Sequence, residues 1–253
     1  MRMFTFNLLM VLSLFAAQAQ TKNLFDEANE AYNAGDYQTA IALYQKIIEE
    51  NHHSAELYFN LGNAHYKLNE IGPSIYYYEK ALLLDPNDSE IKNNLAYAQN
   101  MRLDAIENMP KTTLNKFYDD VLGVFSFDQW AKLAVILSMA FVATYLFYYF
   151  SRSALKKRIA FISSMVILFW GIVCVTLSYL GYQQYKNDNP AIVLAEEVKI
   201  TSEPNSRGQV VFTLHEGTKV NILDQFEGWS KIRIADGQTG WLPAEHIKAL
   251  KDF

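Results

Sequence analysis

Histidines and carboxylates are the side chains of this chain that could bind a metal ion or transfer protons. Its five histidines are His52, His53, His65, His215 and His246. None of them forms the H-E-x-x-H pattern or the Cys/His spacing of a zinc site. The sequence also lacks a Walker loop, a nucleophile elbow and a dinucleotide-binding fingerprint. It therefore predicts no enzyme active site, no metal site and no cofactor.

The charge balance bears on nucleic-acid binding. Residues 20–129 carry 8 basic and 17 acidic side chains, and residues 183–253 carry 8 and 10. Binding to phosphates depends on lysine and arginine, so an acidic balance in both segments argues against nucleic acid as a partner.

Three apolar blocks divide the chain, and the first has the features of a signal peptide. Arg2 precedes an apolar stretch from Leu8 to Phe15, and Ala17-Gln18-Ala19 is the small-x-small pattern that signal peptidase reads. We expect a signal peptide over residues 1–19, with cleavage after Ala19. An uncleaved first membrane helix is the alternative, although the stretch is short for a span.

The other two blocks, residues 130–150 and 159–182, are each long enough to cross a hydrocarbon core of about 30 Å. Between them, residues 151–158 carry four basic side chains and no acidic one, which favours a cytoplasmic loop. We therefore expect a two-helix transmembrane hairpin in the lipid bilayer of a bacterial inner membrane. Its N-terminal and C-terminal domains would both be periplasmic, with a linker at 183–190.

The segment before the hairpin, residues 109–129, has an amphipathic pattern. Its apolar side chains recur at helical spacing, at Leu114, Phe117, Tyr118, Val121, Leu122 and Phe125. Two interpretations stay open: a helix in the membrane interface, or a helix packed on the N-terminal domain. Ser126 with Gln129 three residues later predicts a helix start near Phe127.

The N-terminal domain contains an internal repeat with a period of 34 residues. Ala28-Asn29-x-x-Tyr32 and Tyr44-Gln45-Lys46 recur as Gly62-Asn63-x-x-Tyr66 and Tyr78-Glu79-Lys80. This pattern resembles the tetratricopeptide repeat, an all-α helix-turn-helix unit. We expect two repeats within residues 20–88, at 21–54 and 55–88, followed at 89–108 by a capping helix or a degenerate third repeat.

The resemblance implies that the first helix of each repeat lines a groove that binds peptides or partner helices. By position, the groove residues are Phe25, Asn29, Tyr32, Asn33, Phe59, Asn63, Tyr66, Lys67, Asn93 and Tyr97. Asparagines can hydrogen-bond an extended backbone and tyrosines supply contact area, although Tyr32 and Tyr66 could equally be packing residues. Lys67 is the one basic residue among them, so binding of a free C-terminal carboxylate is not supported.

Residues 191–253 change to short alternating strands, at 191–198, 209–214, 218–225, 229–234 and 239–242. Gly228-Trp229-x-Lys231-Ile232 and Asp236-Gly237-x-x-Gly240-Trp241 resemble bacterial SH3 domains, which implies an all-β SH3-like barrel. Some relatives bind cell-wall peptides through exposed aromatic side chains. The candidates here are Phe226, Trp229 and Trp241, and the alternative is that the tryptophans close the barrel.

The chain is predicted to be multi-domain, and the order of its modules resembles that in the BatE-like proteins of the Bat aerotolerance operons. That resemblance implies an adaptor in an inner-membrane complex with von Willebrand A domain proteins and a MoxR-type ATPase, linked to envelope stress or aerotolerance. The alternative function is a cell-wall sensor or tether that binds peptidoglycan.

Overall fold

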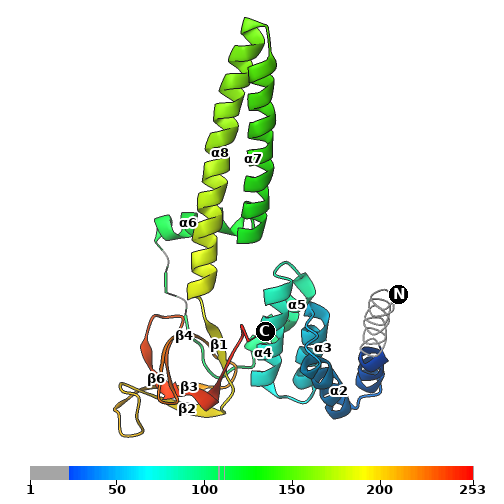
Figure 1. Cartoon of the computed structure of the whole chain (residues 1–253). Helices are drawn as coiled ribbons and strands as arrows, with labels where there is room; N and C mark the ends of the chain where they lie inside the picture. The colour runs from blue at the N-terminus through cyan, green and yellow to red at the C-terminus, as the bar shows by residue number, and fades with distance from the viewer. Residues whose placement is uncertain (1–22, 108, 111, 253) are drawn as a thin grey trace, which may run out of the picture. The chain divides into compact units, whose positions relative to one another are not determined.

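The computed structural model describes residues 23–252 apart from 108 and 111 (Figure 1). The expected signal peptide, residues 1–19, lies outside the described residues. The chain divides into two compact units. One unit combines the residues up to 108 with those from 189 onward, and the other comprises residues 109–188. The sequence of the second unit is thus inserted between the two parts of the first.

The first unit begins with a helical region of five helices. After a helix over residues 23–33 come α2 (Tyr37–Glu49), α3 (Ala55–Lys67), α4 (Ile71–Leu84) and α5 (Ser89–Gln99). Side-chain oxygens at three N-caps, Asp36, Ser54 and Asp88, accept backbone hydrogen bonds at the start of α2, α3 and α5. Two helix pairs and one further helix follow from the 34-residue period.

The segment expected as a terminal helix at 89–108 is helical only as far as Gln99. Residues 100–107 leave the helical region as irregular chain. Ile106 packs against the core of the C-terminal sheet, and Asp104 accepts hydrogen bonds from it. These contacts to a distant part of the chain explain why the helix stops, because a continued helix would keep both residues on α5.

The rest of the first unit is a seven-stranded antiparallel sheet. Its strands are β1 (Pro190–Val193), β2 (Glu197–Thr201), β3 (Val210–His215), β4 (Lys219–Phe226), β5 (Trp229–Arg233), β6 (Thr239–Pro243) and β7 (Ile247–Ala249), with the 3₁₀ turn η1 (Ala244–His246) before β7. The strand order is β3-β2-β6-β5-β4-β1-β7. We call residues 190–252 the sheet domain.

The sheet differs from the expected barrel in two ways. The segment 191–198, expected as one strand, forms β1 and β2, because β1 pairs with β4 and β7 whereas β2 pairs with β3 and β6. Within the described residues, the edge strands β3 and β7 do not pair with each other, so the sheet is not closed. A multi-domain arrangement of repeats, two apolar helices and an antiparallel sheet is confirmed, but closure of a barrel is not.

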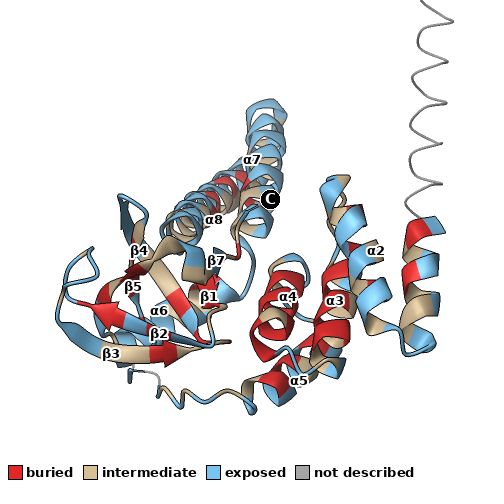
Figure 2. Cartoon of the chain, turned by 90° about the horizontal axis from the view of Figure 1, so that it is seen from below, coloured by how far each residue is buried: buried red, intermediate tan, exposed pale blue. Residues whose placement is uncertain are grey.

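The helical region and the sheet domain share a hydrophobic core. Ile192 of β1 and Leu250 are fully buried and belong to the same cluster as Ile75, Tyr76 and Tyr77 of α4. Ten of the fourteen residues of α4 are buried, which requires that the helix be covered on opposite sides (Figure 2). Helices α3 and α5 cover one side and the sheet domain the other.

Polar contacts surround this shared core. Lys219 Nζ lies 2.7 Å from Glu79 Oε2, and the backbone N–H of Gly72 donates to Glu216 at 3.1 Å. Asp252, near the C-terminal end, accepts a hydrogen bond from Tyr76 Oη at 3.0 Å and pairs with the buried Lys80. Because α4 supplies a partner in each pair, the contacts orient the sheet domain on one helix.

The second unit contains α6 (Thr113–Gly123) and two long apolar helices, α7 (Phe127–Phe150) and α8 (Ala154–Asn187). With 24 and 34 residues, both long helices are long and apolar enough to cross a membrane. The expected capping box is present, because Ser126 and Gln129 exchange hydrogen bonds at the start of α7.

The connection between α7 and α8 is shorter than the expected basic loop at 151–158. Helix α8 begins at Ala154, so Lys156, Lys157 and Arg158 lie in its first two turns and Arg152 lies in the connection. It also continues through most of the expected linker at 183–190 and ends at Asn187, close to Pro190, which cannot donate a helical hydrogen bond. Residues 151–158 contain neither glycine nor proline, so the local sequence does not oppose an early helix start.

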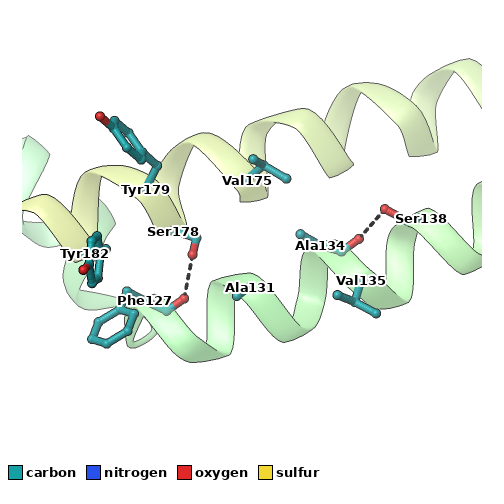
Figure 3. Close-up of a pocket in the computed structure, with 9 residues that line it drawn as sticks. All are labelled: Phe127, Ala131, Ala134, Val135, Ser138, Val175, Ser178, Tyr179 and Tyr182. Atoms are coloured by element: carbon teal, nitrogen blue, oxygen red, sulfur yellow. Dashed lines mark hydrogen bonds between the residues drawn. The ribbon is translucent and has the colours of Figure 1, made fainter.

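Helices α7 and α8 pack side by side and leave an apolar groove of about 460 Å³ between them (Figure 3). The groove is lined by Phe127, Ala131, Ala134, Val135, Ser138, Val175, Ser178, Tyr179 and Tyr182. Ser178 donates a hydrogen bond to the carbonyl of Phe127 at 2.9 Å, and Ser138 donates to that of Ala134 at 2.8 Å. The lining has no charged side chain, so it offers apolar contact rather than ion binding.

Candidate binding groove and aromatic face

Two equivalent hydrogen-bond clusters link the first helices of the repeats. Asn29 Oδ1 accepts from Tyr44 Oη at 2.5 Å and from Asn60 Nδ2 at 3.1 Å. Thirty-four residues further on, Asn63 Oδ1 accepts from Tyr78 Oη at 2.6 Å and from Asn94 Nδ2 at 2.9 Å. The carboxamide oxygen of each predicted asparagine thus joins neighbouring helices.

A pocket of about 350 Å³ lies on the face formed by α3 and α5. It is lined by Tyr32, Asn63, Tyr66, Lys67, Tyr78, Glu90, Asn94 and Tyr97. We call it the groove pocket. Five of the ten predicted groove residues line it, namely Tyr32, Asn63, Tyr66, Lys67 and Tyr97. The structure therefore brings together side chains from the helix at 23–33 and from α3 and α5.

The other predicted groove residues are placed differently. Phe25 and Phe59 are partly buried against the core, with ring centroids 5.8 Å from those of Tyr44 and Tyr78. Asn29 takes part in the first hydrogen-bond cluster. Asn33 and Asn93 are exposed and do not line the groove pocket.

Five residues of the two clusters and the pocket were not predicted from the sequence: Tyr44, Asn60, Tyr78, Glu90 and Asn94. A signal was present, because Tyr44 and Tyr78, and likewise Asn60 and Asn94, are separated by the repeat period of 34 residues. When the same polar residue recurs at equivalent positions of two repeats, it can make the same structural hydrogen bond in each repeat as well as bind a ligand.

The chemistry of the groove pocket is polar and almost neutral. Lys67 and Glu90 are its charged lining residues, and the others are tyrosines and asparagines. Burial raises the pKa of the lining Tyr78, partly offset by hydrogen bonding to Ser74 and Asn94, so this hydroxyl stays protonated as the donor to Asn63. Such a surface suits hydrogen bonding and aromatic contact with an uncharged polar chain.

The predicted aromatic residues of the sheet domain lie on adjacent strands. Phe226 opposes Trp229 at the β4–β5 turn, and Trp241 opposes Lys231, whose Nζ lies 6.0 Å from the indole centroid. Neither tryptophan belongs to the described core of the domain, and Phe226 is 53% exposed. The two tryptophans are half-buried on the face opposite the buried Ser230 and Leu242.

Comparison with known families agrees with this geometry. Residues 55–88 match the tetratricopeptide repeat model, and residues 197–248 match the bacterial SH3 domain model. The chain carries a tetratricopeptide repeat and a bacterial SH3 domain. The SH3 match lies within the sheet domain, which is called the SH3 domain from here on. The repeat match covers α3 and α4, and the SH3 match covers β2 to β6. No curated protein matches the chain.

Within the part of the chain that the structure describes, no group of three or more histidine, cysteine or acidic side chains could hold a metal ion. His65 and His215 instead contact single carboxylates, Glu70 at 2.5 Å and Asp104 at 2.7 Å. Two candidate binding surfaces stand out, the groove pocket and the aromatic face of the SH3 domain.

Proposed function

We propose that this protein is a membrane-anchored adaptor that acts by binding rather than by catalysis, and that its groove pocket holds an extended segment of a partner protein. The observation that carries the proposal is how the first unit is assembled. The SH3 domain covers α4, the second helix of its repeat, whereas the groove pocket is lined by the helix at 23–33, α3, α5 and one α4 tyrosine. Docking of the SH3 domain thus occupies one face of the repeats and leaves the pocket accessible.

Membrane anchorage is supported by the inserted second unit. Both α7 and α8 have the length and apolar composition of a span, and the repeats and the SH3 domain belong to one compact unit. A chain that leaves this unit, crosses a bilayer twice and returns to it keeps both domains on one side. The basic residues near the turn and the signal-like N-terminus favour an inner-membrane protein with both domains in the periplasm.

The partner is best sought in a Bat-type complex. The module order resembles BatE-like proteins, so von Willebrand A domain proteins and a MoxR-type ATPase are the candidate components, with a role in envelope stress or aerotolerance. The near-neutral pocket favours an internal, uncharged polar segment over an acidic C-terminal tail.

Site-specific photo-crosslinking in native membranes tests the adaptor function. A photo-reactive amino acid is placed at Tyr97, which lines the pocket and is 64% exposed, and in the control at Lys92, which is exposed on the same helix outside the pocket. We expect one discrete protein adduct from position 97 and none from position 92. Tyr66→Ala in the same chain, which removes an aromatic ring from the lining, should abolish the adduct.

Mass spectrometry of the adduct then identifies the partner. A von Willebrand A domain protein or a MoxR-type ATPase would support the Bat-type assignment, whereas any other protein would support the adaptor function and refute that assignment. No adduct at position 97, or equal adducts at both positions, would refute the groove as the binding site.

Cell-wall binding is the second candidate function, favoured by the position of Trp229 and Trp241 outside the core of the SH3 domain. The test is cosedimentation of the detergent-solubilised full-length protein with isolated peptidoglycan. Trp229→Ala with Trp241→Ala should abolish pelleting, whereas the control pair Trp130→Ala and Trp170→Ala in the apolar helices should not. Deletion of residues 191–253 is unsuitable, because Ile192 and Leu250 complete the core around α4.

A further inference from the structure

The short helix α6 presents an apolar face that is exposed in the structure. Leu114 is 80% exposed, Phe117 66% and Tyr118 42%, and Leu122 is the one buried residue of the helix. We propose that α6 is an interfacial helix whose apolar face inserts into the outer leaflet beside the hairpin. This inference rests on the proposed membrane location of α7 and α8.

The periodicity of α6 separates its two faces cleanly. At 100° per residue, Leu114, Phe117, Tyr118, Val121 and Leu122 fall within one arc of the helix. The polar residues Asn115, Lys116, Asp119 and Asp120 fall on the opposite arc. A helix of this kind is stable where water meets hydrocarbon.

The position of α6 within its unit matches the level of a membrane surface. It contacts α8, and three residues separate its last residue, Gly123, from the first residue of α7, Phe127. Figure 1 shows α6 lying crosswise to α7 and α8 at the end of the hairpin remote from the connecting turn. If the hairpin crosses the bilayer, a crosswise helix at this end lies near the plane of the membrane surface.

Aromatic side chains gather at the same end of the hairpin. The ring of Phe125, just after α6, lies edge-on to that of Trp130, with 5.0 Å between the ring centroids. The ring centroid of Phe127 lies 5.8 Å from that of Tyr182 and 5.4 Å from that of Tyr185. Tryptophan and tyrosine concentrate where membrane-spanning segments pass the lipid headgroups. The exposed apolar face of α6 is thus adjacent to a belt of the kind that marks this level.

The charges of α6 favour lipid insertion over electrostatic attraction. Its polar face carries Lys116 against Asp119 and Asp120, an excess of negative charge that anionic headgroups would repel. Insertion should therefore occur in zwitterionic bilayers and should not depend on anionic lipid. This requirement distinguishes α6 from basic surface helices.

Spin-label accessibility in reconstituted protein tests the proposal. The single cysteine is removed by Cys174→Ala, and single labels are then introduced into the full chain in phosphatidylcholine vesicles. Leu114→Cys and Phe117→Cys report the apolar face, and the matched Asn115→Cys and Lys116→Cys report the polar face. Val142→Cys and Val166→Cys, on exposed positions of α7 and α8, are membrane references.

We expect the ratio of oxygen to nickel-chelate accessibility to be severalfold higher at 114 and 117 than at 115 and 116, and unchanged when phosphatidylglycerol is added. High ratios at 142 and 166 with equal, water-like values on both faces of α6 would overturn this inference alone. Low accessibility to both reagents at 114 and 117 would show that protein covers the face and would also overturn it. Water-like values at 142 and 166 would overturn the membrane placement and this inference with it.

Discussion

Asp104 joins the irregular segment after α5 to the SH3 domain through three hydrogen bonds. Its carboxylate accepts from the backbone N–H of His215 at 2.7 Å, from Nδ1 of His215 at 2.7 Å and from Thr218 Oγ1 at 2.6 Å. Burial alone would raise the pKa of Asp104, but the hydrogen bonds from Thr218 and His215 outweigh burial and hold the pKa below its ordinary value. The ionised carboxylate therefore stabilises this junction.

Replacement of Asp104 by asparagine should make the free energy of unfolding less dependent on pH in the acidic range. A carboxyl with a lowered folded-state pKa contributes fully above its unfolded value of 3.8 and loses that contribution as the pH falls through the folded value. We expect Asp104→Asn to cost about 1–3 kcal/mol at neutral pH, and the difference from wild type to shrink below pH 3.8. Denaturant unfolding over a pH series measures both quantities.

The matched control for Asp104 is Asp26→Asn, which changes an exposed carboxylate on the first helix. It should shift the free energy of unfolding by no more than about 0.5 kcal/mol at any pH. Equal effects of the two variants would contradict the role assigned to Asp104.

Asp252 is a second carboxylate at this interface with a lowered pKa. Burial alone would raise its pKa, but its hydrogen bonds to Lys80 and Tyr76 outweigh burial.

Helices α3 and α4 approach each other at Gly62, whose position in the repeat requires a small residue. A Cβ atom there would lie 2.5 Å from Cδ1 of Tyr78, whose hydroxyl is bonded to Asn63. Ser74 adds a hydrogen bond to the Gly62 carbonyl at 2.9 Å across the same contact. The tyrosine ring cannot move away without breaking the polar cluster.

Gly62→Ala should therefore destabilise the repeat by about 1–3 kcal/mol, the usual cost of overpacking a core. The same exchange at Gly123, the last residue of α6, meets no atom within 4 Å and should be neutral or slightly stabilising. Thermal unfolding followed by circular dichroism compares the two. A neutral Gly62→Ala would show that the helices can separate at no cost.

A second glycine pair isolates the contact between α4 and the SH3 domain. Gly217 and Gly228 both have positive φ, of 79° and 81°. A Cβ at Gly217 would lie 2.7 Å from Cδ1 of Ile75 on α4, whereas at Gly228 it would meet nothing within 4 Å. Both alanine variants carry backbone strain of about 1–2 kcal/mol, but only the first adds a steric clash.

We accordingly expect Gly217→Ala to lose about 1–3 kcal/mol more than Gly228→Ala in denaturant unfolding. The excess should largely disappear in the Ile75→Ala background, where the clashing methyl group is absent. An excess that persists there would mean that Gly217 matters for the turn alone and not for docking on α4.

At the scale of the whole molecule, the shared core predicts that the repeats and the SH3 domain unfold together. Ile192 and Ile232 of the SH3 domain are both fully buried, but Ile192 belongs to the core shared with the repeats and Ile232 to the core of the sheet itself. Each alanine variant should cost about 2–5 kcal/mol and should shift the helical and the sheet transitions by the same amount.

Two probes separate these transitions. In a Trp130→Phe, Trp170→Phe background, fluorescence reports Trp229 and Trp241 of the SH3 domain, and amide hydrogen exchange in α3 and α4 reports the repeats without the long apolar helices. Coincident curves in wild type and in both isoleucine variants are the expected result. If Ile232→Ala shifted fluorescence alone, the two domains would unfold independently, and the prediction that the shared core couples them would be wrong.

Much of the architecture could be predicted because its signals are local. The two long apolar helices, the Ser126 capping box and the turn glycines each depend on residues that are close together in the sequence, and the repeat is recognised because the same residues recur after 34 positions. Helical phase was less certain: Asn93 was expected in the groove, whereas its neighbour Asn94 lines the pocket. A shift of one residue turns a side chain by about 100° on a helix.

The sequence by itself determined which modules the chain contains and in what order, because periodicity and composition set secondary structure locally. Only the tertiary structure decided that α4 is covered on opposite sides, that Asp104 meets a histidine 111 residues away, and that the repeats and the SH3 domain form one unit. These contacts depend on which surfaces complement each other after the elements have formed. Residues so far apart in the chain have no shared local pattern that could reveal them in advance.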